Sequence, residues 1–371
     1  MEAGGSAGAG GVTTRVDASS RWVSKVREDN ADRGGREVIS GAVRTVDNPT
    51  LWYPAPMADA QLEEVLRVGR RTPADVARYR RSIHRSFATI AAIYLVAGLA
   101  GLAGHAGHAG GPGLYWLLPW VLAVVLVPVT VRLTIQIHEY IHCVGPERAD
   151  LLIRVFPTMI GPLTGYREVH LLHTGHHDHL LDRDDPDLEI MVGRPVWSFV
   201  RAFFYHEYFF FHYVRHEGLA GASHVVELGL RVLLFAAAAL WVPWPTLLLL
   251  LLATRLAFST AYFLLSWYLH REGDSVGTYR KPMPAWLAVV VGALGGPPAL
   301  AFLRYHDLHH RYPDIDVGAL ERLGRQVPFD RAAATVFVLG PCPHREGCAR
   351  CDDAIRTGSG FQARSIQSSG A

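Results

Sequence analysis

The sequence has almost no lysine, little net charge and few cysteines. Only Lys25 and Lys281 are lysines among the 36 basic residues, and the formal net charge is +2. So small a net charge gives no sign of the basic surface typical of nucleic-acid-binding proteins, and we attribute the excess of arginine to the composition of the source genome. The four cysteines are unequally spaced. They do not match the framework of a small secreted disulfide protein, and a reducing compartment is the simpler interpretation.

The start of the chain also lacks several features. It has no cationic segment followed by a short apolar core and a small-residue cleavage site, so we expect no signal peptide. Residues 1–50 have little apolar periodicity and cannot bury enough surface to offset chain entropy, which predicts a disordered tail. Residues 51–84 are expected to form a cytoplasmic, amphipathic helical lead-in. Its helix begins at an N-cap, a first-turn proline and a capping-box acid, namely Thr72, Pro73 and Asp75.

Long apolar runs, by contrast, are abundant, and 50% of the residues are hydrophobic. Four segments are long and apolar enough to span a membrane: Phe87–Ala103, Leu114–Ile137, Val225–Val242 and Leu247–Leu269. The connections Gly104–Gly113 and Pro243–Thr246 contain no lysine or arginine, whereas the segments on the opposite side are rich in arginine. The positive-inside rule therefore places both termini and the long central loop in the cytoplasm.

These runs predict an all-α integral membrane protein of the cell's inner or plasma membrane. Its four transmembrane helices are expected to form two hairpins beneath a cytoplasmic, histidine-rich cap with interfacial helices. Soluble, buried helices are the alternative interpretation, but two adjacent hairpins of this length are hard to bury in a chain of 371 residues.

Histidine is the most informative residue type, because its 19 copies are clustered. The pattern H-x-x-H-H occurs at His173, His176 and His177 and again at His306, His309 and His310, and His138 and His142 form H-x-x-x-H. Neutral imidazole is a good ligand for iron, zinc and copper. A site for two metal ions needs more donors than one helix face presents, so the repeated clusters predict such a site.

Three other apolar or aromatic segments are not expected to cross the membrane, and the first two are predicted to be interfacial or partly inserted helices. Leu151–Leu163 and Trp286–Leu303 are interrupted by glycine and proline, and a single crossing by either would separate one histidine cluster from the others. The interruptions are Pro157 and Gly161 in the first segment, and Gly295, Gly296, Pro297 and Pro298 in the second. The segment Phe203–Val214 has the aromatic density of an interfacial helix.

One alternative function follows from the first cluster alone. With Glu139, the residues His138 and His142 spell H-E-x-x-H, the zinc-protease signature in which the glutamate is the general base. A single-zinc protease needs three protein ligands and leaves both H-x-x-H-H clusters without a role. A non-catalytic metal-binding membrane protein is a further alternative.

Residues 85–325 resemble the membrane fatty acid desaturase and hydroxylase superfamily, whose members carry three histidine boxes around two irons. The resemblance rests on HEYIH as the first box, on HTGHH followed by DDPDL as the second, and on YHDLHHRYPDI as the third. It implies a dioxygen-dependent oxidoreductase with two non-haem irons that desaturates or hydroxylates an aliphatic position. The iron ligands that it implies are His138, His142, His173, His176, His177, His270, His306, His309 and His310.

Other polar residues receive different predictions. His170 is expected either to ligate a metal or to hold a ligand imidazole in place by a hydrogen bond. Asp184, Asp185 and Asp187 are expected to hold ligand imidazoles in the same way, although they also suit a solvated turn. The ligating histidines are expected to stay neutral at pH 7. Arg255 lies inside the fourth span, where it meets either a polar substrate head or a partner within the bundle. The remaining histidines considered are expected to be core, interfacial or solvated, and are His105, His108, His179, His206, His212, His216 and His224.

The segment 326–371 is a C-terminal tail with four soft or borderline donors, Cys342, His344, Cys348 and Cys351. They predict either a separate zinc site or reduced thiols. The sequence shows no b-type cytochrome or reductase domain, so the resemblance implies an external electron donor, such as a ferredoxin with its reductase. A lipid or acyl chain is the expected substrate, with a carotenoid- or sterol-type hydroxylase or ketolase as the alternative within the superfamily.

Overall fold

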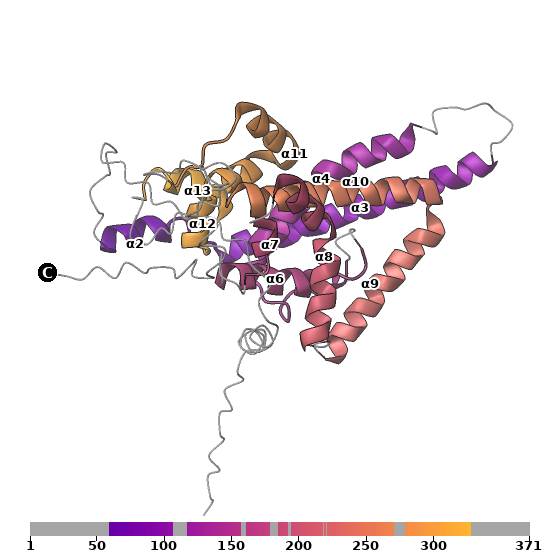
Figure 1. The fold of residues 1–371 in the computed structure, drawn as a ribbon, viewed down its shortest axis with the longest axis horizontal. Coiled ribbons are helices and arrows are strands. Elements are labelled where there is room, and N and C mark those ends of the chain that lie inside the picture. The colour runs from indigo at the N-terminus through magenta and orange to yellow at the C-terminus, as the bar shows by residue number, and fades with distance from the viewer. Residues whose placement is uncertain are drawn as a thin grey trace, which may run out of the picture. The chain divides into compact units, whose positions relative to one another are not determined.

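The computed structural model describes residues 59–106, 117–156, 161–178, 185–191, 194–217, 219, 221–270 and 279–327. This part of the chain is helical and contains no β-strand (Figure 1), as the sequence predicts. The predicted N-terminal tail, nearly all of the predicted C-terminal tail and its Cys/His cluster lie outside the described residues.

The first long helix begins where the sequence predicts. α3 covers Pro73–Ala106, 34 residues without interruption, and follows the short helix α2 over Asp59–Arg67. The backbone N–H of Thr72 donates to Asp75 Oδ2 at 2.9 Å, and the N–H of Asp75 donates to Thr72 Oγ1 at 3.3 Å, which is the expected capping box. At 1.5 Å per residue α3 is about 50 Å long, so it can cross a membrane and still extend beyond it.

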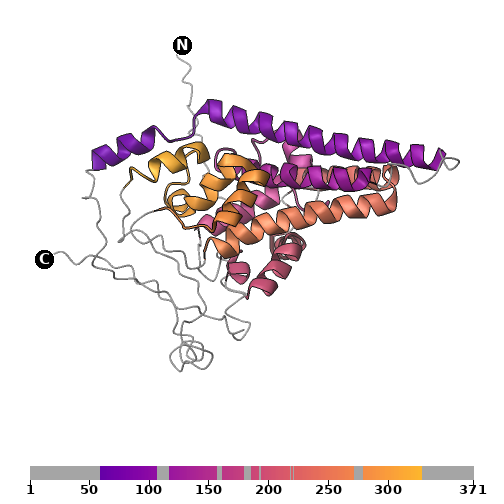
Figure 2. The same ribbon diagram turned by 90° about the horizontal axis from the view of Figure 1, so that it is seen from above.

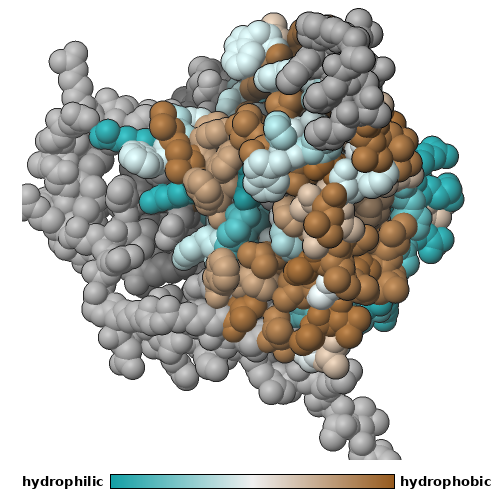
Figure 3. All heavy atoms as spheres, turned by 90° about the vertical axis from the view of Figure 1, so that its right-hand side faces the viewer, coloured by the Kyte–Doolittle hydropathy of each residue, from teal (hydrophilic) through white to brown (hydrophobic). Residues whose placement is uncertain are grey.

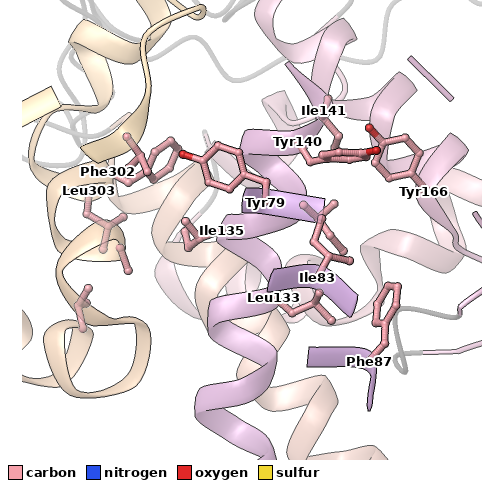
Figure 4. Packing of buried hydrophobic residues seen from close by; sticks show 14 of the residues in the cluster. Tyr79, Ile83, Phe87, Leu133, Ile135, Tyr140, Ile141, Tyr166, Phe302 and Leu303 are labelled. Carbon is pink, nitrogen blue, oxygen red and sulfur yellow. The ribbon is translucent and has the colours of Figure 1, made fainter. Parts of the chain in front are cut away.

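A central layer of three helices forms the core. α4 (Leu118–Ile141) packs between α3 and α10 (Trp244–Phe263), as Figure 2 shows from above. Ile83 and Phe87 of α3 and Leu133 of α4 belong to one buried apolar cluster (Figure 4). No side chain caps the N-terminus of α4 or α10, and each helix has a proline in its first turn. Proline suits this position because the N–H that it lacks would have no partner within the helix.

In the described part of the chain, five helices are long and apolar enough to cross a membrane: α3, α4, α9 (Ala222–Trp241), α10 extended to Tyr268, and α11 (Ala285–Arg304). Their outward surfaces carry large exposed apolar side chains such as Trp120, Val124, Leu233 and Val289. Figure 3 shows apolar residues covering much of one face of the molecule. Such a surface is costly in water and is the surface expected of a membrane protein.

α11 differs from the other four because it folds back on itself. Gly296 has φ 79° and ψ −177°, a conformation that is essentially restricted to glycine, and it breaks the helix in the middle. The backbone N–H of Lys281, just before α11, donates to the carbonyl of Arg304 at its end at 2.7 Å. The segment that leads into α11 therefore lies next to the end of α11. The interruption predicted at Gly295–Pro298 is present.

The helices of the two predicted hairpins pack to different extents. α3 and α4 pack along their length, but α9 diverges from α10 after the turn at Val242–Pro243 (Figure 1). The physical reason is a polar face on α9. His224, Glu227 and Arg231 are its buried residues, and they pair with charged side chains outside α10.

Short elements gather where α4 and α10 end. They are α5 (Leu151–Val155), α6 (Tyr166–Asp178), α7 (Leu188–Met191), η2 (Leu264–Tyr268), α12 (His306–Arg311) and α13 (Val317–Leu323). η2 is a π-helical continuation of α10. The predicted aromatic helix is α8 (Pro195–Glu217), which packs Tyr205 and Phe209 against α10 and exposes Phe204, Tyr208 and Phe211.

Glycine at the break in α11 gives a direct test of this fold. We expect Gly296→Ala to destabilise the protein by about 1–3 kcal/mol, because an L side chain is strained at this backbone conformation. Gly292→Ala is the matched control, since Gly292 lies in the helical part of α11 and an added methyl group there meets no atom within 4 Å. Thermal unfolding in detergent would compare the variants, and an equal midpoint for both would contradict the break.

Candidate metal centre

Histidines from four separate segments converge at the ends of α4 and α10. The structure brings all nine histidines predicted as ligands into two groups, each with its ligand atoms within 4.8 Å of one another. The five-histidine group is His138, His142, His173, His177 and His309. The four-histidine group is His176, His270, His306 and His310. The groups adjoin each other, because the rings of His177 and His310 stack with their centroids 4.4 Å apart.

Helical spacing decides which histidine joins which group. Residues four apart lie on one helix face, so His173 and His177 of α6 point into the same group, as do His306 and His310 of α12. The middle histidine of each H-x-x-H-H cluster points in another direction and belongs to the other group. His176 joins the four-histidine group, and His309 joins the five-histidine group. Each H-x-x-H-H cluster therefore supplies donors to both groups.

The distances between ring nitrogens suit cations shared by several imidazoles. His142 Nε2 lies 2.8 Å from His173 Nε2 and 3.1 Å from His309 Nε2, and the Nε2 atoms of His306 and His310 are 2.8 Å apart. Two nitrogens bound at right angles to one metal, each about 2.1 Å from it, are about 3 Å apart. The histidine groups can therefore hold metal ions.

Unpartnered nitrogens point to the same conclusion. Within the described residues, Nε2 of His138, His177 and His270 is buried and has no hydrogen-bond partner. Buried polar atoms in folded proteins nearly always have partners, because desolvation without one is unfavourable. A bound cation would supply the missing partner for each of these atoms.

Electrostatics keep most of the ligand candidates neutral. Burial, and then the proximity of the other histidines, lowers the pKa of His142, His173 and His177 well below its usual value. The pKa values of His306, His309 and His310 fall for the same reasons. A neutral imidazole keeps the lone pair that a metal needs, as the sequence predicts.

His176 is the exception to predicted neutrality. Burial opposes its protonation, but the charges of Asp185 and Asp187 and the hydrogen bond to Asp185 raise its pKa to about 9. Its Nδ1 lies 3.0 Å from Asp185 Oδ1. Asp185 therefore fixes the ring and leaves Nε2 free to face the four-histidine group, which is the role predicted for this carboxylate.

Asp187 forms a second polar contact beside the same group. It accepts hydrogen bonds from the hydroxyl of Tyr262 and, at 3.0 Å, from Ser266 Oγ. Because Tyr262 lies on α10 and Ser266 on η2, the acidic turn is tied to the helix that leads to His270. Asp184 lies outside the described residues.

Glu139 is not placed as the general base of a zinc protease. Its Oε2 accepts hydrogen bonds from Arg71 Nη2 at 2.8 Å and from the backbone N–H of Val317 at 3.2 Å. Its Oε1 lies 3.4 Å from His138 Nδ1. The side chain is fully buried among these partners, so it anchors α4 to its neighbours beside His138.

An apolar cavity of about 80 Å³ reaches the two groups. Leu133 and Ile137 of α4, Phe258 of α10 and Phe302 of α11 line it. Four of the ligand candidates also line it, His138 and His173 from one group and His176 and His306 from the other, together with His206. A molecule in this cavity would touch both groups while being surrounded by apolar side chains.

Several predicted residues fall outside both groups. His170 lies on α6 beside the site but joins neither group, and His206 is buried in the cavity wall. His224 is a core histidine, with Nε2 2.7 Å from Glu168 Oε1. The side chains of His105, His212 and His216 are not among those described, and neither are His108, His179, Cys342, His344, Cys348 and Cys351.

The structure decides between the two interpretations of Arg255. It forms an ion pair with Glu207 of α8, in which Nη1 donates to Oε2 at 3.0 Å. Arg255 therefore links α10 to α8 within the bundle and does not line the cavity.

A buried ion network beside the site was missed at the sequence level. Arg231 of α9 donates to both carboxylate oxygens of Glu168 on α6 at 2.8 Å, and both side chains are fully buried. Nearby, Arg154 of α5 pairs with Glu227 at 2.9 Å. The available signal was the pair Glu227 and Arg231 inside a predicted span, since charges at such positions usually face a partner.

Comparison with known proteins found no matching family model, and no curated protein or solved structure with significant similarity.

The network predicts a strong effect of removing one charge from α6. Glu168→Gln leaves Arg231 buried without its counter-charge, and we expect a loss of about 3–5 kcal/mol in the free energy of unfolding. Glu147→Gln is the control, because Glu147 pairs with Arg167 but its side chain is 69% exposed, and exposed pairs contribute about 0–1 kcal/mol. Unfolding in detergent by denaturant would measure both, and similar losses would contradict the buried pair.

The contact at His176 predicts a specific effect on metal binding. Asp185→Asn preserves the size of the side chain but removes the charge, and we expect metal affinity at the four-histidine group to fall about 10- to 100-fold. Retention of Fe(II) or Co(II) against a chelator would measure it. Asp314→Asn serves as the control, because Asp314 is an exposed acid paired with Arg70. Equal retention in both variants would remove Asp185 from the site.

Proposed function

We propose that this protein is a membrane-embedded, two-iron oxidoreductase that uses dioxygen and external electrons to desaturate or hydroxylate an aliphatic position. One observation carries the proposal: two adjoining all-histidine groups face a single apolar cavity. Nine imidazoles exceed the three protein ligands that a catalytic zinc site uses. The spacing of the three histidine boxes, which resembles that of the membrane desaturases and hydroxylases, supports the same function.

The proposed membrane topology has four crossings, by α3, α4, α9 and α10. α11 enters the bilayer and returns, because its halves on either side of Gly296 are only about 16 and 12 Å long, against a hydrocarbon thickness of about 30 Å. The bond between Lys281 and Arg304 supports this return. All histidine segments then lie on one side, and the exposed arginines at the start of α3 support a cytoplasmic location for that side.

When bound, the two irons would supply the electrons that activate dioxygen. No protein side chain can activate dioxygen alone. The chain's own residues hold and shield the substrate. Leu133, Ile137 and Phe302 surround its aliphatic part and exclude water, while His138 and His306 present the two groups to it from the cavity wall. A lipid or acyl chain fits this lining better than a polar metabolite does.

Electrons must reach the site from a partner protein. The exposed arginines Arg80, Arg81 and Arg85 lie on the part of α3 that adjoins Tyr79, whose hydroxyl is 3.4 Å from Glu139 in the first box. This positive surface near the histidine groups suits an acidic carrier such as a ferredoxin.

Metal content of the detergent-purified protein tests the proposal. We expect about two irons per chain, one for each histidine group, and the loss of at least about one from His173→Ala and from His306→Ala. His84→Ala is the control, since His84 lies outside both groups and contacts Asp150. A single zinc without iron would end the proposal in favour of a zinc enzyme. Mass spectrometry of lipids from expressing cells would then distinguish loss of two hydrogens from gain of oxygen.

A further inference from the structure

His206 of α8 is a buried polar residue in the wall of the apolar cavity. It is 2% exposed, and within the described residues neither of its ring nitrogens has a hydrogen-bond partner. Its ring packs edge-on against Phe258 of α10, with the centroids 4.4 Å apart, and lies 5.9 Å from Tyr262. Packing alone does not explain a histidine here, since a phenylalanine would fill the same position without leaving two nitrogens unpaired.

The chemistry of the ring limits what it can bind. Burial, and then the nearby charge of Arg255, lowers the pKa of His206 to about 3, so the ring is neutral at physiological pH. A neutral imidazole has one N–H donor and one acceptor nitrogen. It therefore complements an uncharged oxygen, either the hydroxyl of an alcohol or the carbonyl of an ester, amide or ketone.

The rest of the cavity argues against a charged head group. Among the described residues that line it, none is lysine or arginine, and the protonated ring of His176 is already paired with Asp185. A carboxylate or phosphate would therefore enter without a free counter-charge among these side chains. Its one carboxylate, Asp187, already accepts hydrogen bonds from Tyr262 and Ser266. Its negative charge would repel an anion.

We propose that His206 is a specificity-determining residue that binds an uncharged oxygen of an otherwise apolar ligand. The aliphatic part of this ligand would lie against the two histidine groups. The ligand is therefore also the substrate, a step that rests on the proposed function. The substrate class is then a neutral lipid-like alcohol, ester, amide or ketone. A free fatty acid and a plain hydrocarbon are disfavoured.

Matched probes of one chain length test this inference without any turnover. The purified protein in lipid nanodiscs would be dialysed against radiolabelled dodecane, 1-dodecanol, methyl dodecanoate and dodecanoate, with empty nanodiscs as the blank for partition. After the blank is subtracted, we expect the alcohol or the ester to bind about tenfold more tightly than the alkane. One buried hydrogen bond contributes a difference of about this size. The alcohol and ester arms distinguish a hydroxyl from a carbonyl.

Variants separate the hydrogen bond from cavity shape. His206→Phe should bind dodecane as before but lose the tenfold preference, whereas His206→Gln, which keeps a donor and an acceptor, should retain most of it. Phe258→Leu is the control for shape and should weaken binding of all uncharged probes alike. Three results with the wild-type protein would overturn the inference, even if a variant fails to fold. They are equal binding of alkane, alcohol and ester, tightest binding of dodecanoate, and binding of none of the probes.

Iron analysis of the same preparations keeps the two proposals apart. The oxygen preference without iron would leave the His206 site standing and remove the proposed function. Two irons per chain without the preference would remove the His206 site alone.

Discussion

The convergence of many uncharged imidazoles in one buried place is the constraint on which the rest of this structure depends. Such rings have little affinity for one another, and several of their nitrogens have no hydrogen-bond partner in the described part of the chain. Something else must therefore hold the segments together. Buried carboxylates do this, because each links a histidine-bearing segment to a part of the fold that carries none of the ligand candidates.

Two glutamates show how this works. Glu139 follows His138 directly and binds Arg71 of the N-terminal region and the start of α13, so the first box is fixed from two sides. Glu168 lies on α6 ahead of His173 and binds Arg231 of α9. Because unpairing a buried ion is strongly unfavourable, these contacts specify one arrangement of helices even where their net contribution to stability is small.

Much of the candidate site follows from the sequence because metal-ligand patterns are local. His138 and His142, or His306 and His310, are four residues apart, and the helical repeat places each pair on one face whatever the rest of the chain does. The helix start at Thr72 and the break at Gly296 are equally local. The resemblance to membrane desaturases, and the iron that it implies, stays a prediction.

The features that sequence reasoning missed depend on tertiary contacts. The divergence of α9 from α10 requires knowing that Arg231 meets Glu168, which lies 63 residues away. The assignment of His176 and His309 to opposite groups requires the relative orientation of α6 and α12. His206 was expected to be a core or interfacial histidine, and its burial agrees, but only the cavity beside it distinguishes a packed ring from a binding one.

The division of each H-x-x-H-H cluster between both groups has a consequence for the geometry of any pair of cations bound there. His176 and His177 are joined by one peptide bond yet serve different groups, so the spacing between the two ions is set by α-helical pitch and ring length. Flexing of the bundle would move both ions together. In both α6 and α12, neighbouring histidines on one short helix would therefore link the positions of two such cations.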